Sequence, residues 1–172
     1  MTATPLNVGF LTIVQEGAAY LGGYLVTNGW GRPLEFRLSS AVQPNKVQQI
    51  LYGPTLVPYL CADLIGKTLV DRAGIAVNLV VTDREPALDL RLKLDSPVVW
   101  LARSEEAGGR ESIPLPGDRG VLVCHPRFAA DNKTVGELLA ELNQTIDLTE
   151  PFTRIRDAMT EARKLGVNRS AA

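Results

Sequence analysis

An Asn-Gly pair near the start of the chain is the feature that most constrains its fold. Asn28 and Gly29 both tolerate positive φ, which tight turns between antiparallel strands require. The apolar segments 7–14 and 18–27 precede this turn, and the alternating segment 34–38 follows it. The chain is therefore predicted to open with an antiparallel meander of three strands, the third of them buried on one face only. Within the second strand, a Gly-Gly pair predicts a bulge or a close backbone approach.

After the meander, the spacing of apolar residues predicts two helices and then more strands. A short helix is expected over residues 44–51 and a longer one over residues 55–73. Segments 76–81 and 98–102 are nearly continuous apolar runs, which predict strands buried on both faces. Between them, leucines alternate with charged residues over 88–95, and this pattern predicts a strand with one leucine face and one solvent face.

The last part of the chain is predicted to be helical. A polar, glycine-rich stretch at 103–120 indicates a long surface loop, and segment 121–124 indicates a short strand. Capping-box spacing between Thr134 and Glu137 predicts one helix, and Pro151 lies at the start of a second.

Together these patterns predict an α+β fold. The body, residues 1–127, is expected to contain the meander, two helices and further strands in a mixed sheet. Residues 128–172 are expected to form a C-terminal helical hairpin packed on the body, with a frayed tail from about 167.

Bulk composition excludes several classes of protein. The 172 residues include 18 Lys and Arg against 19 Asp and Glu, which argues against a polybasic binder and against an acidic disordered tail. The start of the chain lacks the pattern of a signal peptide, and no apolar run approaches the roughly 18 residues of a membrane span. The two cysteines lie far apart and form no CxxC, which fits a reducing compartment, so we expect a cytoplasmic protein. Because there is no apolar span, we also expect no membrane binding.

Cysteine and histidine are too rare to predict nucleophilic catalysis or a zinc site. Cys124 and His125 are adjacent in a predicted strand, so their side chains should point to opposite faces rather than form a dyad. Cys61 lies on the apolar side of its predicted helix, where a thiol usually packs as a small hydrophobe. We expect both cysteines in the core, and we predict neither a metal nor a cofactor.

Acidic residues near the end of segment 76–81 suggest an alternative. Asp83 and Glu85, with Asp89 and Asp95, contain the carboxylates that Mg²⁺ prefers, although turn formation and solvent exposure explain these residues better. A small-molecule enzyme that uses Asp83, Glu85 or His125 is one alternative function.

A second alternative comes from the order of the predicted elements. Three antiparallel strands, a helix and then a buried strand resemble the start of ribonuclease H-like domains. The nucleases of that group need carboxylates on the first strand and the first helix to hold two metal ions. Segment 7–14 has no acid, and the short helix carries Gln48 and Gln49 instead. This alternative is therefore a nucleic-acid-associated domain that lacks the metal ligands. The charges of the last helix are mixed in sign, which favours a solvated face over phosphate contact.

The leading prediction rests on the aromatic residues and prolines of the first third. Tyr, Trp and Arg are enriched at binding hot spots because they combine apolar area with a polar group. Here they are Tyr20, Tyr24, Trp30, Arg32, Tyr52 and Tyr59. Ordinary core packing explains the same residues without a binding role. The function predicted is a non-catalytic interaction or assembly subunit that binds a protein partner, or a second copy of itself, around the turn at 28–33 and the corner at 52–54.

Overall fold

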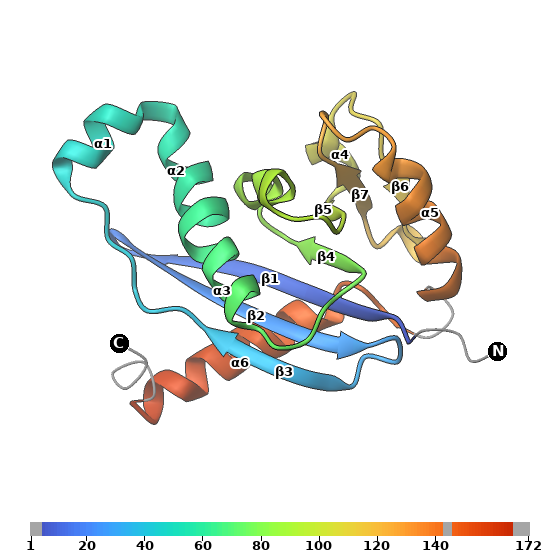
Figure 1. The fold of residues 1–172 in the computed structure, drawn as a ribbon, viewed down its shortest axis with the longest axis horizontal. Coiled ribbons are helices and arrows are strands. Elements are labelled where there is room, and N and C mark those ends of the chain that lie inside the picture. The colour runs from blue at the N-terminus through green and yellow to red at the C-terminus, as the bar shows by residue number, and fades with distance from the viewer. Residues whose placement is uncertain (1–4, 143–145, 167–172) are drawn as a thin grey trace.

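A mixed sheet of seven strands forms the middle layer of the fold (Figure 1). The computed structural model describes residues 5–142 and 146–166. The strands are β1 (Asn7–Glu16), β2 (Ala19–Asn28), β3 (Pro33–Leu38), β4 (Leu79–Thr82), β5 (Val98–Ala102), β6 (Ile113–Pro114) and β7 (Val121–Cys124). Their order in the sheet is β3-β2-β1-β4-β5-β7-β6. The α+β class and the N-terminal antiparallel meander are confirmed.

Helices cover both faces of this sheet. One face carries a helical run made of η1 (Gly53–Thr55), α2 (Leu56–Pro58), η2 (Tyr59–Gly66) and α3 (Lys67–Arg72), in which η2 is π-helical. The helix α1 (Lys46–Tyr52) precedes this run and projects away from the sheet (Figure 1). The other face carries α5 (Asp131–Leu142) and α6 (Glu150–Lys164) (Figure 1). Each face has its own buried apolar cluster. Both predicted N-terminal helices are confirmed. No helix in the described residues is long and apolar enough to cross a membrane.

The third strand is less buried than its sequence predicts. Leu34 and Phe36 of β3 are 42% and 37% exposed. The more buried residue between them is Glu35, which pairs with Arg37 and accepts the backbone N–H of Gly74 at 2.9 Å. The reason is that β3 is the edge of the sheet, whereas α6 packs on β1 and β2.

The two adjacent glycines of β2 allow helices to approach from both sides. A Cβ added to Gly22 would lie 2.2 Å from Cγ2 of Ile65, and one added to Gly23 would lie 2.6 Å from Cγ2 of Ile155. Consecutive residues of a strand point to opposite faces of the sheet. Gly22 therefore lets η2 approach from one face, and Gly23 lets α6 approach from the other. The predicted close approach is confirmed.

The strand predicted over 88–95 is wrong. The segment forms the 3₁₀ helix η3 (Glu85–Lys93), which packs against η2 and β5. The reason is topological: β4 pairs in parallel with both β1 and β5. A chain that joins two parallel neighbours must return along one face of the sheet, so the segment between β4 and β5 cannot be an adjacent strand.

The long stretch at 103–120 is more ordered than the predicted surface loop. It contains the short helix α4 (Ser104–Ala107), the strand β6 and the 3₁₀ turn η4 (Pro116–Asp118). β6 pairs antiparallel with β7 and so extends the sheet.

The C-terminal helices share one apolar cluster with the sheet. Val135 and Leu139 of α5 and Phe152 and Ile155 of α6 are buried together with strand residues. The domain boundary at 127 stays a prediction, and the tail from about 167 lies outside the described residues.

The predicted order of three antiparallel strands, helices and then a buried strand is present. The helical run joins β3 to β4, and β4 lies beside β1 in parallel. This observation concerns topology only and says nothing of chemistry.

Replacing Leu90 and Leu92 separately by alanine tests the 3₁₀ assignment. In a strand these two residues would share a face, but in η3 Leu90 is fully buried and Leu92 is 43% exposed. Leu90→Ala should cost about 2–5 kcal/mol of unfolding free energy, and Leu92→Ala about 1 kcal/mol or less. Urea denaturation measures both, and equal losses would contradict the assignment.

Alanine at two glycines should change stability in opposite directions. Gly22→Ala drives a methyl group into Ile65 and should destabilise the fold by about 1–3 kcal/mol. Gly136→Ala in α5 meets no atom within 4 Å and should stabilise the fold by about 0.5–1 kcal/mol through helix propensity. Thermal and urea unfolding of both variants measure this, and a neutral Gly22→Ala would refute the close approach.

Candidate binding site

The six predicted partner-binding residues do not form one surface. Tyr20 and Tyr24 are 7% and 1% exposed and belong to the core above the sheet. The Tyr24 ring packs so closely on Gly9 that a Cβ there would lie 2.3 Å from its hydroxyl oxygen. Burial also raises the pKa of Tyr24 far above its ordinary value. These two tyrosines are core residues, because β2 is an inner strand between β3 and β1, and helices pack on it from both faces.

The other four residues separate into two places, the first exposed and the second half-buried. Trp30 is 76% exposed in the turn between β2 and β3, with Arg32 beside it. Tyr52, the last residue of α1, and Tyr59, the first residue of η2, stack with ring centroids 4.4 Å apart and planes 18° apart. The turn and α1 lie at opposite ends of the molecule (Figure 1), so one partner segment does not contact both places at once. A binding role for these four residues stays a prediction.

Helix α1 projects from the body without burying any of its residues (Figure 1). Its start is well defined, since the Asn45 and Gln48 side chains cap each other's backbone N–H groups at 2.8 and 3.0 Å. Val47, Ile50 and Leu51 are 63%, 70% and 76% exposed. Positions three and four apart share one side of a helix, so these side chains form a continuous apolar face, called here the α1 face.

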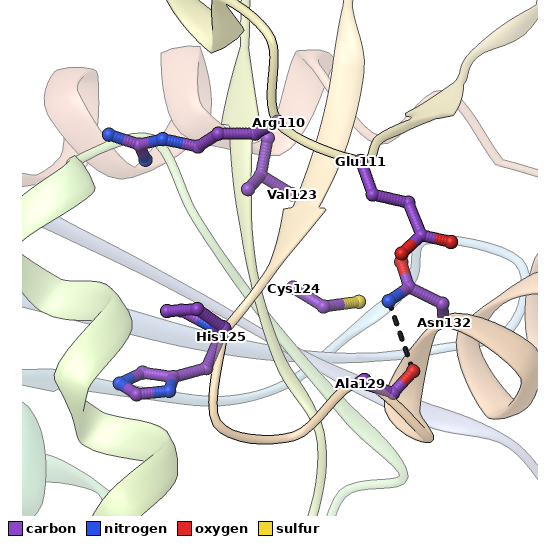
Figure 2. Close-up of a pocket in the computed structure, with 8 residues that line it drawn as sticks. Arg110, Glu111, Val123, Cys124, His125, Ala129 and Asn132 are labelled. Carbon is purple, nitrogen blue, oxygen red and sulfur yellow. Dashed lines mark hydrogen bonds between the residues drawn. The ribbon is translucent and has the colours of Figure 1, made fainter.

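A groove continues from the tyrosine pair toward the end of β7. Its central part, called here the Asp89 pocket, has a volume of about 660 Å³ and lies between α2, η3 and the turn after β7. The adjoining tyrosine pocket, about 330 Å³, contains Tyr52 and Tyr59 and shares Pro58 and Asp89 with it. On the other side, a pocket of about 350 Å³ shares Arg110 and His125 with the Asp89 pocket (Figure 2).

His125 occupies the middle of this groove in a single tautomer. Its Nδ1 accepts the backbone N–H of Arg127 at 3.1 Å, so the ring proton is on Nε2. Nε2 lies 3.1 Å from Oδ1 of Asp89 and donates to it. His125 is 5% exposed, whereas the Asp89 side chain is 48% exposed. In this pair the buried His125 ring donates the hydrogen bond, and the half-exposed Asp89 carboxylate accepts it.

A buried ion pair fixes the turn that carries His125. Arg91 of η3 bonds to Asp131 at the start of α5 at 2.7 Å, and their side chains are 13% and 10% exposed. The Arg91 guanidinium lies 3.8 Å from the ring centroid of Phe128, and that ring meets His125 edge to face. η3, the turn after β7 and α5 are therefore locked together around the Asp89 pocket.

The residues predicted for an enzyme do not all meet. Glu85 and His125 both line the Asp89 pocket, and Glu85 pairs with Arg110 at 2.9 Å. Asp83 pairs instead with Arg156 of α6. Sequence reasoning considered Asp89 only as a magnesium ligand and missed its contact with His125, because the alternating pattern placed it on the solvent face of a strand. The available signal was Pro86, which follows the strand end closely and favours the first turn of a helix.

The cysteines are core residues without an activating partner. Figure 2 shows the side chains of Cys124 and His125 pointing in different directions, as expected for neighbours at a strand end. Both thiols are free and buried, and burial raises the pKa of each to about 11. Across residues 5–142 and 146–166, no three His, Cys, Asp or Glu side chains gather in a way that could hold a metal ion.

Comparisons with known proteins identify no family. No protein-family model matches the chain, and no curated protein matches it. Among solved structures, a variant of endonuclease V from Ciona intestinalis, in complex with a 23mer DNA that contains an inosine, is 11% identical. The match covers 74% of this chain and 76% of that chain with a TM-score of 0.37. A likeness at this level carries no argument about function.

Breaking the Arg91–Asp131 pair should be costly. Arg91→Met leaves a buried carboxylate without its partner, and we expect a loss of about 3–5 kcal/mol in unfolding free energy. The matched control is Lys67→Met, which removes the exposed ion pair with Asp71 and should cost about 0.5 kcal/mol or less. Urea unfolding of both variants measures the difference. Equal losses of unfolding free energy would show that the buried pair does not hold η3 and α5 together.

The two thiols should react slowly in the folded protein. Because the pKa of each is about 11, both remain protonated at pH 8, and their reactivity should rise as the pH approaches 11. A chromogenic disulfide reagent should label neither thiol quickly at pH 8 and both in denaturant. Fast labelling of one folded thiol at pH 8 would contradict the assignment of that cysteine to the core.

Proposed function

We propose that this chain is a non-catalytic cytoplasmic interaction subunit that binds a protein partner through the α1 face and the adjoining Tyr52–Tyr59 pair. The observation that carries the proposal is a helix with three large apolar side chains more than 60% exposed and none buried. Exposed apolar groups that gather on one element are typical of interaction sites, because their transfer from water on binding is favourable.

The tyrosine pair strengthens this proposal. Stacked rings offer a rigid aromatic surface that loses little conformational entropy on binding. Tyr52 is the last residue of α1, so a partner that covers Leu51 also reaches Tyr52. The two free thiols support the cytoplasmic part of the proposal.

Charge pairing argues against the nucleic-acid alternative. The basic side chains of α6 are engaged with carboxylates: Arg154 with Glu150, Arg156 with Asp83, Arg163 with Glu16, and Lys164 with Glu161. A phosphate backbone would have to compete with these internal pairs, whereas nucleic-acid binders present concentrated and accessible positive charge.

The enzyme alternative is weaker than binding on geometric grounds. Nδ1 of His125 is occupied by the Arg127 N–H, and Nε2 donates to Asp89, so neither ring nitrogen is free to act as a base. Asp83 lies apart from Glu85 and His125 in its pair with Arg156.

Charge introduced on the α1 face should abolish partner binding. Ile50→Asp and Leu51→Asp remove exposed apolar area without disturbing the core, so we expect wild-type stability and at least a tenfold loss of affinity. Sedimentation velocity over a range of concentrations tests binding to a second copy. Affinity capture from the native host, compared between the wild type and the variants, tests binding to another protein.

The matched control is Leu165→Asp, which places the same charge at a residue that is 77% exposed after α6. This variant should retain the partner. A strict monomer from which wild type and α1 variants capture the same proteins would refute the proposal.

A further inference from the structure

We propose that the Asp89 pocket binds the cationic head of an Arg or Lys side chain on the partner, so that the groove recognises a basic residue beside the segment that covers the α1 face. The inference deepens the proposed function and rests on it. It adds the chemistry of the ligand group and the residue that recognises it.

The charge of the pocket favours a cation. The Asp89 carboxylate accepts a hydrogen bond from Nε2 of His125, and because Nδ1 of that ring accepts the Arg127 N–H, the ring brings no positive charge to the pair. The other acid and base of the Asp89 pocket, Glu85 and Arg110, pair with each other. In the tyrosine pocket, Asp63 and Lys93 contribute one charge of each sign. The carboxylate of Asp89 is thus the uncompensated charge where the two pockets meet.

The walls of the pocket suit the stem of a long basic side chain. Val57, Pro58, Pro86 and Leu88 give one side of the Asp89 pocket an aliphatic lining. Lys and Arg bury their methylene stems along such surfaces while the charged head finds a polar partner. Asp89 provides that partner at the shared edge of the two pockets.

The tyrosine pair favours arginine over lysine. Tyr52 and Tyr59 lie in the pocket that shares Asp89, so a group bound to this carboxylate comes near their rings. A guanidinium is planar, stacks on aromatic faces and donates two parallel hydrogen bonds to a carboxylate, whereas an ammonium acts as a point charge.

The carboxylate is held in place before any ligand arrives. Its hydrogen bond comes from a ring that is 5% exposed, and the turn carrying that ring is locked by the Arg91–Asp131 pair. A fixed acceptor loses little freedom on binding, which favours recognition of a single group. The same geometry disfavours an anion, because Arg110 is already paired and Asp89 would repel it.

The test uses small probes and the chain's single histidine. N-acetyl-arginine amide, N-acetyl-lysine amide and the uncharged isostere N-acetyl-citrulline amide are titrated into the full protein, and the imidazole proton–carbon NMR signals of His125 are followed. We expect a saturable shift with the arginine probe, a weaker effect with lysine and none with citrulline. Binding should also weaken with added salt.

Variants decide whether Asp89 is responsible. Asp89→Asn keeps the shape of the side chain and removes its charge, so the arginine affinity should fall about tenfold or more. Asp95→Asn, at an exposed aspartate after η3, should leave the affinity unchanged. Retained dispersion of the amide spectrum shows that both variants are folded. An equal response to citrulline and arginine, an unchanged affinity in Asp89→Asn, or no saturable shift would each overturn the inference.

The two proposals fail in distinguishable ways. The arginine probe needs no partner, and Ile50→Asp should not change its binding because α1 does not line the Asp89 pocket. Loss of partner capture on α1 substitution with no arginine binding would overturn only the pocket inference. Arginine binding without any effect of α1 substitutions would overturn only the proposed function.

Discussion

The parallel pairing of β4 with both β1 and β5 is the constraint on which the rest of the structure depends. Parallel neighbours require the chain to cross back over the sheet between them, and this crossing is made by η3. Leu90 anchors the crossing in the core. Because η3 runs over the face that also carries α2, the two helical segments enclose a groove between them. The candidate site is therefore a consequence of strand direction.

A second contact gives this groove its defined shape. The Arg91–Asp131 pair joins the crossing helix to the start of α5 across 40 residues of sequence, and Phe128 packs beneath the guanidinium. The turn that places His125 against Asp89 lies between these elements. The proposed function rests on this rigid polar pair together with a helix, α1, that leaves its apolar residues in water.

The predictions from sequence were most accurate where local pattern decides structure. The Asn28–Gly29 pair predicted the meander, although the residue with positive φ in this turn is Gly31 and not Asn28 or Gly29. Helical periodicity predicted both N-terminal helices. The prediction of a strand over 88–95 was wrong. Alternation of apolar and charged residues indicates which residues can be buried, but not which neighbouring element covers them. For the same reason the pattern of β3 could not show that Leu34 and Phe36 lie beyond the cover of α6. Tyr24 had the residue type of a binding hot spot and the position of a core residue.

The sequence by itself determined the α+β class, the order of most elements and the scarcity of groups for nucleophilic or zinc chemistry. Only the tertiary structure decided that Asp89 meets His125, that Asp83 turns away to Arg156, and that the six aromatic and basic candidates divide between the core and two distant surfaces. The physical reason is range. Turn preference and periodicity act between residues a few positions apart, whereas a site is made by contacts between segments that strand pairing brings together from distant parts of the chain.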